Sequence, residues 1–232
     1  MQDRRSAVYI PVMQPSREMA WPVYAAKWAA RGLLHVPVRL RMAVDRDFPW
    51  LVADSVRWLL GFLRPNMTGF EWGSGRSTLF FARHSARLVS VEHKAKWFRR
   101  VSANLAERSL HNAECLFRPP DPQARSSPMR PAILAELGFR PKPELAAYAD
   151  AILDYPPDCF DYVCVDGRAR IECAVNALDR LKACGALSLD NSERAKYRPV
   201  FAVLADWPRH SFANGVWETT IFRKPDRCWK SP

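Results

Sequence analysis

The stretch FEWGSGRST at residues 70–78 decides the fold of this 232-residue chain. It joins a predicted strand over 68–72 to a predicted helix over about 76–85, through a turn that contains Gly73 and Gly75. Glycine at both positions lets the backbone turn sharply and approach a ligand closely. Thr78 stands where a dinucleotide-binding turn would need a third glycine, and the Gly-Lys-Ser of a Walker loop is absent. The stretch therefore predicts a strand–turn–helix unit that binds a ligand of another kind.

Short strands and helices alternate along the rest of the chain. This alternation favours an α/β fold with a mostly parallel sheet and helices on both faces. Asn214-Gly215 favours a tight hairpin, which would add an antiparallel edge to the sheet. The predicted strands after the first span 87–92, 113–117, 160–165, 186–189, a segment around Phe212, and 216–222; the predicted helices span 49–63, 95–108, 144–153, 171–183 and 195–205.

Two acidic residues stand at the carboxyl ends of the first two strands, where ligands bind in such sheets. Glu71 precedes the glycine turn, where its carboxylate would repel a pyrophosphate and favour a sulfonium or amino group. Glu92 ends the second strand and could accept hydrogen bonds from two ribose hydroxyls. The pair points to a nucleoside that carries positive charge. The alternative is a plain tight turn with a surface glutamate at the strand end.

The fourth and fifth strands also end in polar residues. Asp166, Asp190 and Asn191 offer three oxygen ligands of the kind that Mg²⁺ prefers. The alternative is that Asp166 orients a substrate or cofactor while the other two cap the next helix. Arg168 and Arg170 are candidates to clamp an anionic substrate, or else belong to a solvated helix start.

Together these residues resemble the motifs of class I S-adenosylmethionine-dependent methyltransferases. Residues 70–78 resemble motif I, 89–93 the acidic ribose-binding strand end, 160–167 the fourth strand and 185–191 the fifth. The resemblance covers roughly residues 48–223 and implies a Rossmann-like sheet of seven strands with a reversed last hairpin. It implies S-adenosylmethionine as cofactor. The implied cofactor-binding residues are Glu71, Gly73, Ser74, Gly75, Ser77, Glu92, His93 and Asp166.

The resemblance also implies methyl transfer, with Asp166 beside the transferred methyl group. We expect Asp166 and Arg168 to be the catalytic residues, Arg168 as the candidate clamp for an anionic substrate. Asp166, Asp190 and Asn191 are similar in layout to the metal triad of catechol-type O-methyltransferases, so Mg²⁺ is a candidate cofactor. Ala169 occupies the place of the lysine base of those enzymes, and Ser77 replaces the third glycine of motif I. No Asn-Pro-Pro-Tyr motif of amino-methylating enzymes is present, which favours an oxygen acceptor.

We therefore expect O-methylation of a small-molecule or glycan acceptor. The alternatives are an RNA methyltransferase and a cofactor-binding scaffold without turnover. Lys and Arg exceed Asp and Glu by 35 to 24, and this net charge of +11 favours acidic partners, nucleic acid among them.

Two segments depart from the repeating pattern. Residues 1–47 predict a helical or irregular extension of a methyltransferase-like domain over 48–232, and residues 118–143 form a Pro/Arg-rich insertion in that domain. The sequence predicts no membrane-spanning segment and no signal peptide, which leads us to expect a cytoplasmic protein. The six scattered cysteines predict a reduced protein without a structural zinc site.

Overall fold

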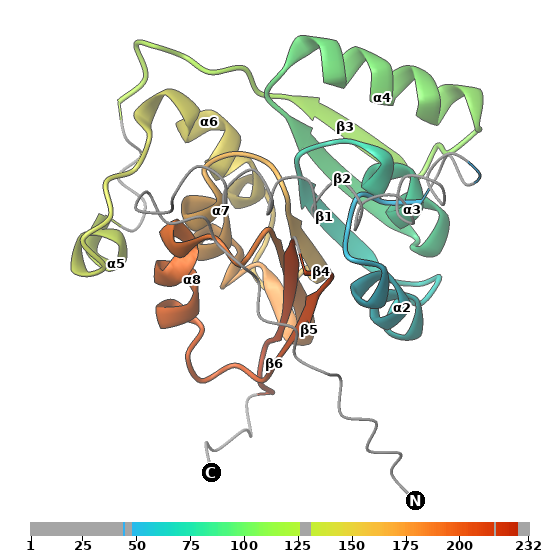
Figure 1. Ribbon diagram of the computed structural model, residues 1–232. Coiled ribbons are helices and arrows are strands. Elements are labelled where there is room, and N and C mark those ends of the chain that lie inside the picture. The colour runs from blue at the N-terminus through green and yellow to red at the C-terminus, as the bar shows by residue number, and fades with distance from the viewer. Residues whose placement is uncertain (1–43, 45–47, 126–130, 216, 227–232) are drawn as a thin grey trace, which may run out of the picture.

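A computed structural model describes residues 44, 48–125, 131–215 and 217–226 of the chain. Its sheet has the strand order β3-β2-β1-β4-β5-β7-β6 (Figure 1). The first five strands pair in parallel, while β7 pairs antiparallel with both β5 and β6. The α/β fold with seven strands and an antiparallel last hairpin is thereby confirmed. The strands are β1 (Thr68–Trp72), β2 (Arg87–Glu92), β3 (Ala113–Phe117), β4 (Phe160–Val165), β5 (Leu181–Asp190), β6 (Arg209–Ala213) and β7 (Glu218–Arg223).

Helices cover both faces of the sheet. One face carries α2 (Ala53–Phe62), α3 (Arg76–His84) and α4 (Ala95–Glu107). The other carries α5 (Pro131–Glu136), α6 (Ala146–Ala149), α7 (Arg170–Ala177) and α8 (Arg198–Val203). Because both faces are buried, neighbouring residues of the central strands enter different cores. Val163 and Val165 of β4 belong to the α7 side, and Tyr162 and Cys164 belong to the α3 side.

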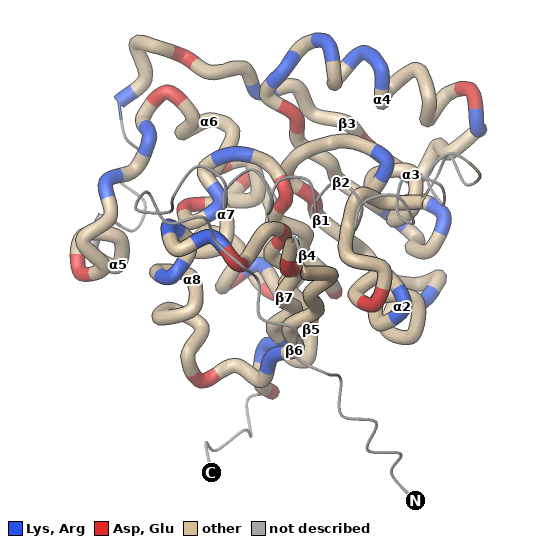
Figure 2. The backbone as a smooth tube through the Cα atoms, in the orientation of Figure 1, with Lys and Arg blue, Asp and Glu red and all other residues tan. Residues whose placement is uncertain are grey.

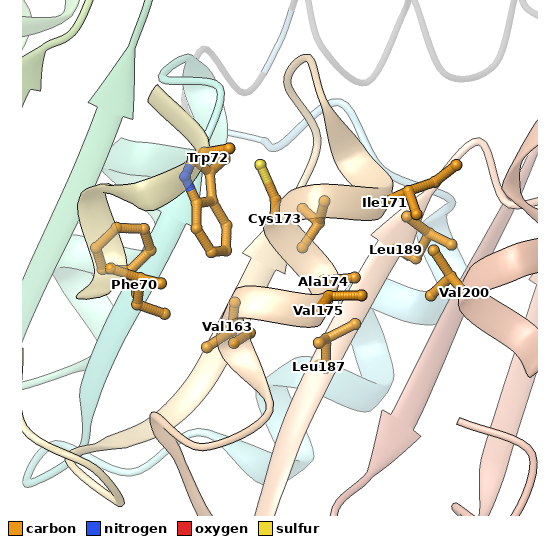
Figure 3. Close-up of a cluster of buried hydrophobic side chains, with 14 of the residues drawn as sticks. Phe70, Trp72, Val163, Ile171, Cys173, Ala174, Val175, Leu187, Leu189 and Val200 are labelled. Atoms are coloured by element: carbon orange, nitrogen blue, oxygen red, sulfur yellow. The ribbon is translucent and has the colours of Figure 1, made fainter. Parts of the chain in front are cut away.

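Large side chains fix the α7 side of the sheet (Figure 3). Phe70 and Trp72 of β1 are fully buried, and their ring centroids lie 4.7 Å apart in edge-to-face contact. The indole N–H of Trp72 donates a 2.8 Å hydrogen bond to the backbone carbonyl of Tyr148 in α6. Such a partner removes the cost of burying the indole's polar atom. The sequence around the glycine turn therefore also anchors the helical layer on this face.

Two predicted helices differ from the structure. The helix expected over 171–183 ends at Ala177, and β5 begins already at Leu181 rather than at residue 186. The β4–β5 pairing jumps from Phe160–Leu181 to Tyr162–Ala186, which is a bulge that the apolar spacing of this segment does not reveal. The helix expected over 144–153 is broken into 3₁₀ turns over Pro143–Leu145 and Asp150–Asp154, on either side of α6.

The two irregular segments are only partly described. The insertion over 118–143 contains α5, whereas residues 126–130 lie outside the described residues. The extension over 1–47 is outside them as well, apart from Val44. None of the described helices is long and apolar enough to cross a membrane.

Candidate functional site

The turn after β1 lies directly against the turn after β4. Gly73 has a φ of +96°, and a Cβ atom there would lie only 2.8 Å from the Cα of Gly167. Its N–H donates to the carbonyl of Val91 at 2.9 Å, and the N–H of Asp166 donates to the carbonyl of Trp72 at 3.0 Å. Glycine is required at position 73 because both the left-handed backbone and the close approach exclude a side chain.

Gly75 is a glycine for a different reason. A Cβ atom there would have only the hydroxyl of Ser77 within 4 Å, at 3.9 Å, and Gly75 lines the large cavity described below. A side chain at this position would therefore extend into the cavity rather than into the protein. This is the arrangement expected where a ligand lies against bare backbone.

The two glycines predict opposite outcomes on substitution. Gly73→Ala is expected to lower stability by about 2–4 kcal/mol, because it adds strain and overpacking. Gly75→Val is expected to leave the melting temperature nearly unchanged and to weaken binding of S-adenosylmethionine at least roughly tenfold, since the new side chain fills cavity space. Thermal unfolding and calorimetric titration separate the two effects. Gly61→Ala on α2, where a Cβ meets nothing within 4 Å, is the control.

A buried polar network supports the turn from below. Oε2 of Glu71 accepts hydrogen bonds from the hydroxyls of Thr78 at 2.6 Å and Ser90 at 2.7 Å. The Thr78 oxygen in turn accepts the N–H of Gly75 at 2.9 Å, and the hydroxyls of Ser74 and Ser90 lie 2.7 Å apart. Oε1 of Glu71 is buried and has no partner among the described residues. The network connects the fully buried Glu71 to the backbone of the turn, and Glu71 is not among the residues that line the cavity.

Burial raises the pKa of Glu71 although the side chains of Ser77, Thr78 and Ser90 lower it, and the charge of Glu92 raises it further. A carboxyl group with a raised pKa binds its proton more tightly in the folded state than in the unfolded state. Folding stability contributed by this group is therefore lost as the pH rises from the ordinary glutamate pKa through the raised one.

Glu71→Gln is expected to flatten the pH dependence of stability at pH values above the ordinary pKa of glutamate. Glutamine keeps an acceptor for Thr78 and Ser90 but cannot ionise, so the loss of stability with rising pH is reduced. Denaturant unfolding at a series of pH values measures this difference. A variant whose curve runs parallel to that of the unchanged protein would contradict the raised pKa.

Glu92 ends β2 in a fixed orientation at the cavity wall. Its side chain is nearly buried, and Oε1 accepts the backbone N–H groups of His93 at 2.9 Å and Lys94 at 2.7 Å. Among the described residues these contacts engage Oε1 and not Oε2, so Oε2 is available to a ligand. The ring of His93 packs edge-to-face on Tyr148, with 5.3 Å between centroids, and lines the same cavity. The side chains of Glu92 and His93 are thereby both held at the cavity wall, at the end of β2.

Most of the predicted site residues line one cavity of about 1070 Å³ at the carboxyl edge of the sheet. This volume is at the upper end of the roughly 300–1,000 Å³ typical of small-molecule sites, so it has room for more than one ligand. Glu71 and Asp190 are the two predicted residues that do not line the cavity. Those that do are Gly73, Ser74, Gly75, Ser77, Glu92, His93, Asp166, Arg168, Arg170 and Asn191.

The ends of β4 and β5 do not have the geometry of a metal site. The guanidinium of Arg170 lies 2.9 Å from Oδ1 of Asp166 and 3.7 Å from Oδ2 of Asp190, where a cation bound by both carboxylates would have to lie. The described residues contain no group of three or more His, Cys, Asp or Glu side chains able to hold a metal ion. Because the guanidinium of Arg170 contacts both aspartates, the predicted triad of Asp166, Asp190 and Asn191 does not fit Mg²⁺. Arg170 itself is nearly buried and engaged, so an anion clamp would rest on Arg168.

Asp166 brings a partly exposed carboxylate to the cavity wall. About a quarter of its side chain, 24%, is exposed, and it lines the cavity between the glycine turn and Arg168. Burial raises the pKa of Asp166, and neighbouring Asp190 raises it further, while Arg170 opposes them. A carboxyl group with a raised pKa is a better proton acceptor when it is ionised than an ordinary aspartate is.

Part of the cavity wall comes from α4 and from the 118–143 insertion, which the sequence motifs do not indicate. One face of α4 lines the cavity with Trp97, Arg100 and Asn104, at spacings of three and four residues that a helical projection would have revealed. From the other side come Lys142 and Glu172. Oε1 of Glu172 accepts the N–H of Lys142 at 3.0 Å, and its buried Oε2 has no partner among the described residues. No signal in the sequence pairs these two residues, because thirty positions separate them.

Comparison with known proteins gives similarity at the level of structure. No family model and no curated protein matches the sequence. An rRNA methylase from Streptococcus thermophilus is 12% identical, with a TM-score of 0.53, over 75% of this chain and 95% of the other. A Streptococcus mutans protein in complex with SAH is 10% identical, with a TM-score of 0.53, over 73% and 95% of the two chains.

A methyltransferase-like protein from Silicibacter pomeroyi is 20% identical, with a TM-score of 0.52, over 77% of this chain and 89% of the other. At these identities the likeness concerns the fold. It agrees with the strand order and with the reversed last hairpin. The chain therefore has the fold of the class I methyltransferases, as the resemblance in its motifs implied.

Proposed function

We propose that the protein is an S-adenosylmethionine-dependent methyltransferase that methylates an oxygen atom of an acidic small-molecule or glycan acceptor. The observation that supports this best is the convergence of Gly75, Glu92 and Asp166 on one cavity. These three residues come from the ends of three different strands or the turns that follow them. A shared cavity is what a cofactor that spans the carboxyl edge of the sheet requires.

The residues present fit this cofactor. The free Oε2 of Glu92 would accept the ribose hydroxyls, and the backbone at Gly75 would contact the methionine end. S-adenosylmethionine supplies, when bound, a methyl group that its sulfonium makes electrophilic. The chain's own contribution is to hold the acceptor in line with that methyl group, and correct positioning accounts for much of the rate in such displacements. That the buried Glu71 takes part in cofactor binding stays a prediction.

Asp166 is the proposed general base. Its carboxylate lines the cavity, and its raised pKa suits removal of a proton from an acceptor hydroxyl. An Oδ atom of Asp166 would hold the proton that the acceptor hydroxyl gives up. Arg168, Arg194 and Lys196 line the same side of the cavity and would attract a carboxylate, sulfate or phosphate on the acceptor. These cations are the reason for proposing an acidic acceptor.

Calorimetric titration with S-adenosylmethionine and with its demethylated product tests the proposal, with NADH as the control ligand. Binding of the two adenosyl ligands, without binding of NADH, is the expected result. Equal affinities with EDTA and with Mg²⁺ are expected as well, because the carboxylates do not form a metal site. Absence of binding by either adenosyl ligand would contradict the proposal and favour a scaffold that has lost the cofactor.

A second candidate acceptor is RNA, and the exposed face of α4 favours it. Trp97 is 43% exposed, and the guanidinium of Arg100 lies 5.3 Å from the centroid of its ring. Lys94 and Arg108 extend this face in both directions along the cavity wall, and Figure 2 shows basic residues along α4. An exposed aromatic ring flanked by cations is the combination that stacks on bases and pairs with phosphates in single strands.

Binding to a single-stranded oligoribonucleotide, measured by fluorescence anisotropy at several salt concentrations, tests this candidate. Trp97→Ala is expected to weaken binding roughly 5- to 100-fold, because one stacked base is lost. Arg100→Ala is expected to reduce the salt slope by about 0.7, the contribution of one phosphate contact in a single strand. Arg99→Ala is the matched control, since Arg99 is exposed on the same helix and is not among the cavity-lining residues. Salt-independent, weak binding would leave the small-molecule or glycan acceptor.

A further inference from the structure

Arg170 is a buried cation that connects the ends of β4 and β5. It opens α7, and only 7% of its side chain is exposed. Nη2 donates to both the carbonyl oxygen of Asp166, at 2.8 Å, and its Oδ1, at 2.9 Å. Nε donates to the carbonyl of Gly167 at 3.0 Å, and Nη1 donates to the carbonyl of Asp190. Three of the four contacts are to backbone, so the guanidinium fixes the course of two strand ends.

An aromatic ring and a second carboxylate also lie near the guanidinium, which borders the cavity on its remaining exposed part. The ring of Tyr197 lies 5.4 Å from its Cζ atom, which places an aromatic face against the cation. Oδ2 of Asp190 lies 3.7 Å from Nη1, and Oδ1 of Asp190 accepts the hydroxyl of Thr219 at 3.0 Å. Both oxygens of Asp190 are thus engaged by protein groups. A buried charge with this many partners is stable only because each is in place.

We propose that Arg170 is the permanent cation of this site and stands where related layouts of two aspartates and an asparagine would hold a divalent metal. The guanidinium keeps its charge at any physiological pH and spreads it over five donors in a plane. A Mg²⁺ ion needs an octahedral shell of oxygens at about 2.0–2.1 Å. The carboxylate oxygens that would begin this shell already contact Arg170 and Thr219.

Arg170 therefore acts as a positioning residue. By holding Oδ1 of Asp166 together with the backbone of the same residue, it fixes the carboxylate at the cavity wall without contact to the acceptor being needed. Its effect on methyl transfer rests on the proposed function. The exclusion of a metal does not rest on the proposed function, because it follows from the positions of the Arg170, Asp166 and Asp190 side chains alone.

The test is titration with Mn²⁺, followed by electron paramagnetic resonance, and needs neither cofactor nor acceptor. The unchanged protein is expected to show no Mn²⁺ binding that Asp190→Asn removes. Arg170→Ala vacates the space between the two carboxylates, so it is expected to bind Mn²⁺ at least roughly tenfold more tightly than the unchanged protein. The double variant Arg170→Ala/Asp190→Asn is expected to lose this acquired binding.

Arg170→Lys provides the conservative comparison. It keeps the positive charge but not the planar fork, so it is expected to stay without Mn²⁺ binding while its melting temperature falls. A merely structural arginine would give the same Mn²⁺ behaviour in the lysine and alanine variants. If Arg170→Ala folds and binds Mn²⁺ no better than the unchanged protein, the proposal is overturned.

Mn²⁺ titration of the unchanged protein and of Asp190→Asn tests the proposal even if Arg170→Ala does not fold. Mn²⁺ binding by the unchanged protein that Asp190→Asn abolishes would show a metal site beside the guanidinium and overturn the proposal; its absence supports Arg170 as the cation. A failure of S-adenosylmethionine to bind would refute the proposed function alone, because the Mn²⁺ titration is carried out without it.

Discussion

Glu92→Ala is expected to weaken binding of S-adenosylmethionine by roughly 10²- to 10⁴-fold. The variant removes a charged acceptor for two ribose hydroxyls, and each such hydrogen bond contributes about 1.5–3 kcal/mol. The carboxylate is already held by the N–H groups of His93 and Lys94, so little ordering is required when the ligand binds. Calorimetric titration of both proteins with the cofactor measures the loss.

Glu114→Ala on β3 is the matched control. Glu114 is half exposed, forms a 3.2 Å ion pair with Arg87 and does not line the cavity. An exposed pair of this kind contributes little to stability. The control is expected to bind the cofactor as the unchanged protein does. If Glu92→Ala and Glu114→Ala both bind S-adenosylmethionine as tightly as the unchanged protein, Glu92 does not bind the ribose. The assignment of the site would then be wrong.

Asp166→Asn is expected to reduce the rate of methyl transfer by roughly 10²- to 10⁴-fold, the usual contribution of a general base. Asparagine has nearly the same shape but cannot take up the proton of the acceptor hydroxyl. Affinity for the cofactor is expected to change far less, because the Oδ1 contact with Arg170 can persist with an amide oxygen. Single-turnover transfer to an acceptor found by screening acidic hydroxylated compounds measures the rate.

The pH profile gives this prediction its sharpest form. A general base works only when deprotonated, so the rate of the unchanged protein should rise with pH through the raised pKa of Asp166. Asp166→Asn should remove this rise. Asp154→Asn, at an exposed residue outside the cavity, should keep it. A profile that is the same in all three proteins would exclude Asp166 as the base.

Sequence patterns alone predicted the sheet well, because its central strands are short apolar runs between clear turns. The predicted bounds of β1, β2, β3 and β4 agree with the structure. The pattern failed at β5, where a bulge over 182–185 lets a helix-like spacing continue into a strand. The spacing of apolar residues cannot reveal a bulge of this kind, because the bulge depends on contacts with another strand. One of these contacts is the ion pair between Lys182 and Asp161 of β4.

Only those site residues that lie at strand ends or in the turns after them could be predicted from the sequence. Glycine turns and acidic strand ends stand out in the sequence, and most of these residues do line one cavity. The sequence did not reveal that the guanidinium of Arg170 lies against two carboxylates at the cavity wall, whereas Arg168, two positions earlier, lines the cavity without these contacts among the described residues. Ala169 between them has a φ of +46°, and this left-handed residue sets the directions of its neighbours. Nothing in the residue types around it indicates that conformation.

The contact between Gly73 and Gly167 has a consequence for how a ligand is received. Each turn is bonded to the neighbouring strand, Gly73 to Val91 and Asp166 to Trp72, and the two turns touch backbone to backbone. The two turns therefore form one continuous wall of the cavity that hydrogen bonds within the protein hold in place. Binding of a ligand therefore costs little conformational entropy at this wall, because no loop has to become ordered there. Selectivity at this wall is then a matter of shape, while adaptation to different partners is left to the long side chains opposite.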